Sequence, residues 1–161
     1  MNVELKKIYD DAAGRYFTDV EESQIRMFAD GMIQRIETMQ AVERAEAAIV
    51  QDVTMSVLGR FPEIRSLHGQ SSEAKIRRDQ TYVLRYAAMS HVLMDPNYIY
   101  DRLAVWLRTI LMALVNVEYV TYGLGQLVTA CRKHLPEADA NAVVPYVEVV
   151  LEEFTNYRSA A

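Results

Sequence analysis

Cysteine, glycine and proline are scarce in this sequence. Its one cysteine, Cys131, cannot form an internal disulfide and supplies no set of thiolates for a zinc site. Six glycines and four prolines in 161 residues are too few for the dense turns of a β-sandwich. These shortages favour a reducing compartment and argue against a disulfide-stabilised or all-β fold.

Long apolar runs and clusters of basic residues are also missing. The longest apolar run, LMALVNV at 111–117, is much shorter than the roughly 20 residues of a membrane-spanning helix. The net charge of −5 comes without any lysine- or arginine-rich block, so an electrostatic footprint for nucleic acid is absent. The N-terminal segment MNVELKKIYDD has no apolar stretch typical of a signal peptide. We therefore expect a cytoplasmic protein with no integral membrane segment and no nucleic-acid partner.

What the sequence does contain predicts a single all-α domain over residues 1–161. Hydrophobic residues make up 51% and charged residues 24%, an ordinary globular composition. Between sparse turn signals the apolar residues recur at helical spacing, and no segment alternates with the two-residue period of a strand. We predict helices over residues 2–14, 19–30, 32–60, 72–94, 98–115, 118–133 and 141–157.

Local signals predict where several of these helices begin and end. Thr18 or Asp19 is a suitable N-cap for the second predicted helix. Asp95-Pro96 should end the fourth, because the residue before a proline is disfavoured in the α conformation. Pro145 is tolerated only near a first turn, so the regular part of the last helix is expected to start as late as residue 144. The clearest apolar stripe belongs to helix 98–115 and consists of Ile99, Leu103, Trp106, Leu107, Ile110 and Leu114.

Residues 76–96 carry a resemblance to a known family. They read IRRDQTYVLRYAAMSHVLMDP. This segment resembles the pigment-bearing helix of the phycobiliproteins (allophycocyanin and phycocyanin), whose pattern is C-x-R-D-x-x-Y-Y-L-R-Y followed later by D-P. The residues that match are Arg78, Asp79, Tyr82, Leu84, Arg85, Tyr86, Asp95 and Pro96.

The resemblance extends beyond that helix. The segments YDRLAVWLRTILMALVNV at 100–117, AAGRYFTDVE at 12–21 and IETMQAVERAEAAIV at 36–50 are similar to the family's corresponding helices and joints. The match implies a globin-like helical domain with an N-terminal helical hairpin over residues 1–30. It also implies an antenna (phycobilisome) role in photosynthesis, which in a cyanobacterium-like cell would place the protein peripheral to the thylakoid membrane.

The sequence departs from the family at the pigment site. Ile76 stands where the family has its pigment cysteine, so no thioether to a bilin can form there. The preceding loop, EIRSLHGQSSEAK at 63–75, is shorter and lacks the family's P-G-G-N stretch. Cys131 does not align with the family's second attachment position and is expected to be an inert thiol. We therefore expect no covalent pigment.

The retained residues leave two alternatives for non-covalent binding. In the family, the aspartate matching Asp79 accepts hydrogen bonds from bilin pyrrole N–H groups, and the arginine matching Arg78 pairs with a propionate. Ile76, Asp79 and Val83 share one helix face, and Tyr82 belongs to the same motif. One alternative is a surviving pocket that binds a linear tetrapyrrole (bilin). In the other, Ile76 and Val83 fill the space and Asp79 faces water. The altered loop favours the closed pocket.

The N-terminal hairpin predicts a dimer, with an identical chain or with a phycobiliprotein-like subunit. In the family this hairpin packs against a second subunit, where an aspartate pairs with the arginine of Y-L-R-Y. The matching residues are Asp11 and Arg85, and Arg15 and Tyr16 form the joint between the two helices. The alternative is a hairpin that folds back on its own body with these charges exposed.

Neither a metal site nor a catalytic site is predicted. The three histidines, His68, His91 and His134, show no ligand spacing such as i, i+4 on one helix. No nucleophile, base and orienting group can be assembled from the chain. Two functional hypotheses remain: a phycobilisome-related protein without covalent bilin, which binds bilin non-covalently or acts as a pigment-free assembly member, and a globin-like regulatory or sensor module that binds another protein.

Overall fold

The computed structural model describes residues 3–64, 71–114 and 117–160, and all regular structure within them is helical. This confirms the all-α prediction. His68 and most of the loop before α5 lie outside the described residues. The elements are α1 (Val3–Asp11), α2 (Asp19–Asp30), α3 (Met32–Arg60), α5 (Ser71–Leu93), α6 (Pro96–Ile99), the π-helix η1 (Tyr100–Ala104), α7 (Val105–Leu114), α8 (Val117–His134) and α9 (Glu137–Ala160).

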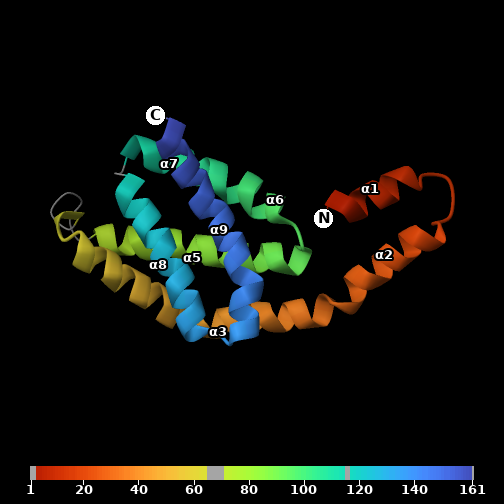
Figure 1. The fold of residues 1–161 in the computed structure, drawn as a ribbon, viewed down its shortest axis with the longest axis horizontal. Helices are drawn as coiled ribbons and strands as arrows, with labels where there is room; N and C mark the ends of the chain where they lie inside the picture. Colours follow the sequence, from red (N-terminus) through yellow and green to blue (C-terminus); the bar gives the residue numbers. More distant parts are fainter. Residues whose placement is uncertain (1–2, 65–70, 115–116, 161) are drawn as a thin grey trace.

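The helices form a packed body from which the α1–α2 hairpin extends to one side (Figure 1). The body consists of α3, α5, α8 and α9, with α6, η1 and α7 along one side. The long helix α3 lies along the lower edge of the body in this view and continues toward the hairpin (Figure 1). No helix in the described residues is both long and apolar enough to cross a membrane. The fully buried core comes from the body helices and includes Ile49, Val53, Leu84, Ile99, Leu124, Leu127, Val143, Val147, Val150 and Phe154.

The predicted N-cap of α2 is confirmed at Thr18. Its hydroxyl accepts a hydrogen bond from the Glu21 backbone N–H, and the Glu21 carboxylate accepts one from the Thr18 N–H at 2.8 Å. The Arg15 guanidinium donates two hydrogen bonds of 2.8 Å to the same carboxylate, and these contacts lower the pKa of Glu21 to about 2. Gly14, at φ 82°, supplies the left-handed turn before this cap. The joint between α1 and α2 is therefore held by side-chain hydrogen bonds as well as by the backbone turn.

The predicted stop at Asp95-Pro96 is also confirmed. Helix α5 ends at Leu93, and the Asp95 side chain accepts a 3.0 Å hydrogen bond from the Asn97 N–H, capping α6. Met94 adopts a positive φ of 51° at the corner. The long helix that carries the retained motif thus ends where the motif's D-P pair falls.

Two expectations about helices were wrong. Helix α9 begins at Glu137 and contains Pro145 in its interior, not in its first turn. Packing outweighs the missing hydrogen bond there, because the neighbouring Val143, Val144 and Val147 are buried. The stripe of helix 98–115 is interrupted by the π-helical turn, and Trp106 is 49% exposed although it was placed in the stripe. A π turn adds a residue to the helical repeat and so rotates the side chains that follow it.

Candidate functional site

A pocket of about 370 Å³ lies beside α5, on the face that carries the retained motif. Ile76 and Val83 line it and do not fill it, so the expectation of a closed pocket was wrong. The polar lining residues are Ser72, Lys75, Arg78, Asp79, Gln80 and Tyr119. The apolar lining residues come from α3, the segment after it, α5, α7 and α8, and are Val57, Ile64, Ile76, Val83, Leu107, Ile110, Val120 and Leu124.

The helical repeat of α5 brings most of the predicted pigment-site residues together. Ile76, Asp79 and Val83 are spaced three and four residues apart and therefore share the face that borders the pocket. Arg78 borders it as well. Tyr82 does not line the pocket, and its side chain is 40% exposed.

Asp79 is the acidic group of the pocket. Its side chain is 17% exposed and pairs with the neighbouring Arg78, whose side chain is 56% exposed. Arg78 reaches Oδ1 of Asp79 with both Nε, at 2.9 Å, and Nη2, at 2.8 Å. The second oxygen, Oδ2, accepts no hydrogen bond from the described residues. Asp79 is therefore paired with Arg78 through Oδ1, and its Oδ2 is available to accept a hydrogen bond from a ligand.

One wall of the pocket is held in place by contacts between α8 and the end of α3. The Tyr119 hydroxyl donates a 2.9 Å hydrogen bond to Glu63, and this bond raises the pKa of Tyr119. The Phe61 ring packs against Tyr119 with centroids 4.6 Å apart and meets Tyr122 edge-on. The Ser72 hydroxyl, at the start of α5, donates to the Ile64 carbonyl at 3.0 Å. These contacts support the pocket although the loop between Ile64 and α5 differs from the family's.

Sequence reasoning missed Gln80 as a pocket residue. Gln80 lines the pocket, is only 7% exposed, and has a buried Oε1 that accepts no hydrogen bond from the described residues. It fits because Gly123 lies opposite: a Cβ at that position would come within 2.9 Å of Gln80 Nε2. The spacing of four residues from Ile76 was the available signal, since it places Gln80 on the same face.

Cys131 is buried in the core and has no exposed surface. Burial raises the pKa of its thiol to about 12, so the reactive thiolate is scarce at neutral pH. This environment is that of an inert core thiol and fits poorly with pigment attachment.

We expect protein isolated from bilin-producing cells to show no zinc-enhanced fluorescent band after denaturing electrophoresis. Ile76 offers no sulfur, and Cys131 is inaccessible. A maleimide should likewise label Cys131 only after denaturant is added, with denatured protein as the positive control. A fluorescent band would show that Cys131 is an attachment site, and rapid labelling of the native protein would show that its thiol is accessible.

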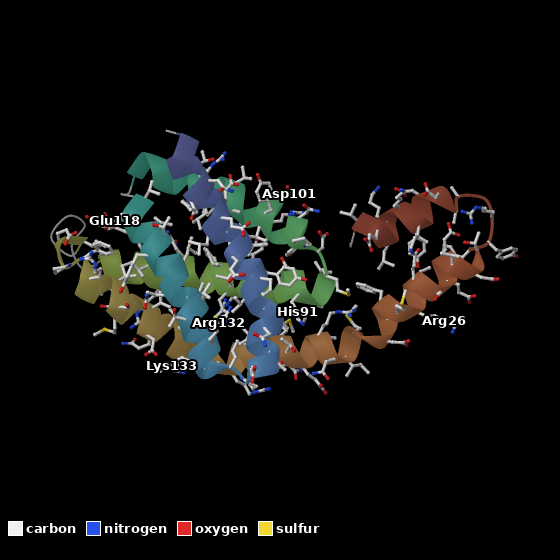
Figure 2. All side chains as sticks on the ribbon, in the orientation of Figure 1. Arg26, His91, Asp101, Glu118, Arg132 and Lys133 are labelled. Carbon is white, nitrogen blue, oxygen red and sulfur yellow. The ribbon has the colours of Figure 1, made fainter. Side chains whose placement is uncertain are left out.

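The two histidines that the structure describes, His91 and His134, lie against other protein groups. His134 Nε2 lies 2.7 Å from Asp52 Oδ2, and the adjacent Lys133, at the end of α8, also donates to this oxygen (Figure 2). His91 lies on α5, and burial, followed by the charge of Arg35, lowers its pKa. Within the described residues no group of histidine, cysteine and carboxylate side chains is arranged to hold a metal ion.

Within a single chain, the residues predicted for a dimer interface are not all brought together. Arg85 binds Glu46 on α3 through two hydrogen bonds of 2.7 and 2.6 Å. Asp11 lies at the end of α1 and is exposed, and Tyr16 at the hairpin tip is 97% exposed. Arg15 is engaged with Glu21, as described above. Large apolar side chains are 39–97% exposed over the hairpin and the start of α3: Val3, Tyr9, Tyr16, Phe17, Val20, Met27 and Ile33.

Comparison with known proteins agrees with these features. The model of the family described as "Phycobilisome protein" matches residues 9–154. The chain is also 25% identical over 146 residues to the allophycocyanin alpha chain 2 of Microchaete diplosiphon. That alignment covers 88% of this chain and 91% of the relative. The family match runs from the end of α1 into α9 and includes every residue that lines the pocket, and the helical structure is consistent with the globin-like fold that the resemblance implied.

Proposed function

The chain belongs to the phycobilisome protein family, and we propose that it binds a linear tetrapyrrole non-covalently in the pocket beside α5. The observation that carries the proposal is the apolar pocket with the Asp79 carboxylate in its lining. Apolar walls suit the conjugated body of a bilin, and a few fixed polar groups suit its orientation. We propose binding as its role, with no catalytic step.

Both residues of the retained Arg78-Asp79 pair have a place in this proposal. Asp79 Oδ2 is available to accept hydrogen bonds from pyrrole N–H groups, while Arg78 neutralises the carboxylate through Oδ1. Lys75 borders the pocket and supplies positive charge for the anionic propionate tails. Arg78 uses Nε and Nη2 for Asp79, which leaves Nη1 for a propionate. Arg77 is less available, because its guanidinium is bonded to Glu73 and Gln51.

Substituting Asp79 by asparagine should weaken binding of biliverdin or phycocyanobilin by roughly ten- to a hundredfold. A hydrogen bond to a charged group contributes about 1.5–3 kcal/mol, and the substituted side chain would offer only a neutral amide. The measurement is a titration of the apoprotein followed by the red-shifted absorption of bound bilin. Asp101→Asn is the matched control, because Asp101 is an exposed aspartate on η1 outside the pocket lining (Figure 2).

The titration also tests whether the pocket binds bilin at all. Micromolar or tighter binding by the wild type, weakened in Asp79→Asn and unchanged in Asp101→Asn, supports the proposal. Equally weak binding by all three proteins would refute it. The chain would then be better described as a pigment-free assembly member, or as a globin-like regulatory or sensor module that binds a protein partner.

We further propose that the hairpin joins this chain to a second copy or to another phycobilisome-type subunit, in an assembly peripheral to the thylakoid membrane. The exposed apolar side chains of the hairpin support a protein partner. Arg85 uses Nε and Nη2 for Glu46, which leaves Nη1 for the carboxylate of Asp11 of the partner subunit. Such a contact adds to the pairing with Glu46 without breaking it.

A further inference from the structure

Gln80 is an unusual residue for the place it occupies. It lies on α5, its amide approaches Gly123 of α8, and it is almost fully buried. Its Oε1 has no partner among the described residues. A buried amide oxygen without a hydrogen bond destabilises a protein, whereas an apolar side chain of similar shape at this position would not. The sequence therefore carries a polar group here that the packing of the chain alone does not require.

We infer that the Gln80 amide binds the ligand end that lies next to Ile76, by hydrogen bonds to a terminal lactam ring. This inference rests on the proposed function and identifies a residue of the same pocket. Gln80 follows Ile76 by one helical turn, and both residues line the pocket. Gln80 is thus placed to replace, with hydrogen bonds, the covalent link that an isoleucine cannot make.

The chemistry of a side-chain amide selects this ligand group. A lactam presents an N–H donor and a C=O acceptor side by side, and a glutamine amide presents the complementary acceptor and donor. Rotation of the Gln80 amide by half a turn exchanges Oε1 and Nε2. Oε1 is covered by protein atoms here, so binding of the lactam requires the amide to turn its donor and acceptor outward to the pocket. Asp79, the preceding residue, meets the inner N–H groups of the same ligand. The two neighbouring residues would therefore hold different rings of one tetrapyrrole.

The test combines a shape-matched substitution with a modified ligand. Gln80→Met keeps the length and apolar volume of the side chain but removes its hydrogen-bonding groups. We expect about tenfold weaker binding of biliverdin, the equivalent of one or two neutral hydrogen bonds. The denaturation midpoint of the apoprotein should stay the same or rise, because the unpartnered buried oxygen is gone. A side chain needed only for structure would give the opposite change in stability.

The modified ligand is a biliverdin lactim ether, in which O-methylation of the terminal lactams removes the N–H donors. Wild type should bind it more weakly than biliverdin, and Gln80→Met should bind the two ligands alike. Equal affinity of the wild type for both ligands would overturn the inference, and this measurement does not depend on how well the variant folds.

The outcomes separate this inference from the proposed function. Wild-type protein that binds no biliverdin would refute the proposed function. The role of Gln80 alone would be refuted if the wild type binds biliverdin, Asp79→Asn weakens this binding and Gln80→Met leaves it unchanged.

Discussion

Removal of residues 1–18 is expected to abolish dimer formation and to leave a monomer or insoluble protein. The deletion takes away α1 and the hairpin joint, which carry the exposed side chains of Val3, Tyr9, Tyr16 and Phe17. It also removes the buried side chains of Ile8 and Ala12 and exposes the surface that they cover, so some precipitation is expected. Sedimentation velocity of the purified proteins over a range of concentrations measures the change. A truncated protein that remains a well-behaved dimer would refute the proposed interface.

A full-length variant separates loss of the interface from loss of folding. Asp11→Lys should weaken the dimer, because it places a positive charge next to Arg85 of the partner subunit. The pair is worth about 0–1 kcal/mol if exposed, and several times that to break if the interface excludes water. Asp10→Lys is the matched control: Asp10 is the adjacent residue, also an exposed aspartate, and it pairs within α1 with Lys6 at 2.7 Å. Equal effects of both substitutions would indicate general repulsion and not a specific pair.

Features set by a few neighbouring residues could be predicted from the sequence. The cap at Thr18 requires only a hydroxyl and the glutamate three residues later, and the end of α5 requires only Asp95 and Pro96. The face shared by Ile76, Asp79 and Val83 follows from the helical repeat alone. These interactions are local, so distant parts of the chain do not alter them.

Features that depend on contacts between distant helices could not be predicted. Pro145 lies inside α9 because buried valines on both sides keep the helix packed against the body. Trp106 is 49% exposed although the next residue, Leu107, is buried, a difference that the apolar spacing does not reveal. The role of Gln80 depends on Gly123, a residue of another helix that leaves room for the amide.

At the candidate site too, the shape of the pocket depends on contacts between distant helices and not on one local segment. The expectation that Ile76 and Val83 fill the pocket depends on the altered loop at 63–75. The walls of the pocket come largely from other helices, through Val57, Leu107 and Leu124. One changed segment therefore does not close the pocket, and the retained carboxylate keeps its apolar surroundings.

The link between hairpin and body depends on Arg35, a nearly buried arginine on α3 that is 8% exposed. Its Nη2 donates to the Phe28 carbonyl at 2.5 Å and its Nε to the Val92 carbonyl at 3.1 Å. These carbonyls belong to the last turns of α2 and α5, where backbone acceptors have no partner within the helix. The guanidinium also stacks on the Phe28 ring, and Gly31 permits the close approach, because a Cβ there would lie 2.4 Å from Nη1.

Arg35→Leu should therefore lower the free energy of unfolding by about 2–4 kcal/mol, since two partly buried carbonyls lose a charged donor. Denaturant titration of the variant measures this loss. Arg44→Leu is the control on the same helix: Arg44 is exposed, and a change within about 0.5 kcal/mol is expected there.

The variant should also loosen the hairpin more than the core. Limited proteolysis should cut Arg35→Leu at the α2–α3 junction faster than wild type, while the body stays resistant. If the proposed dimer is correct, the same variant should associate more weakly, because the hairpin is held less firmly in the orientation that a partner must meet. An Arg35→Leu protein with wild-type stability and an unchanged cleavage pattern would show that the chain alone fixes the hairpin and that the buried guanidinium has another role.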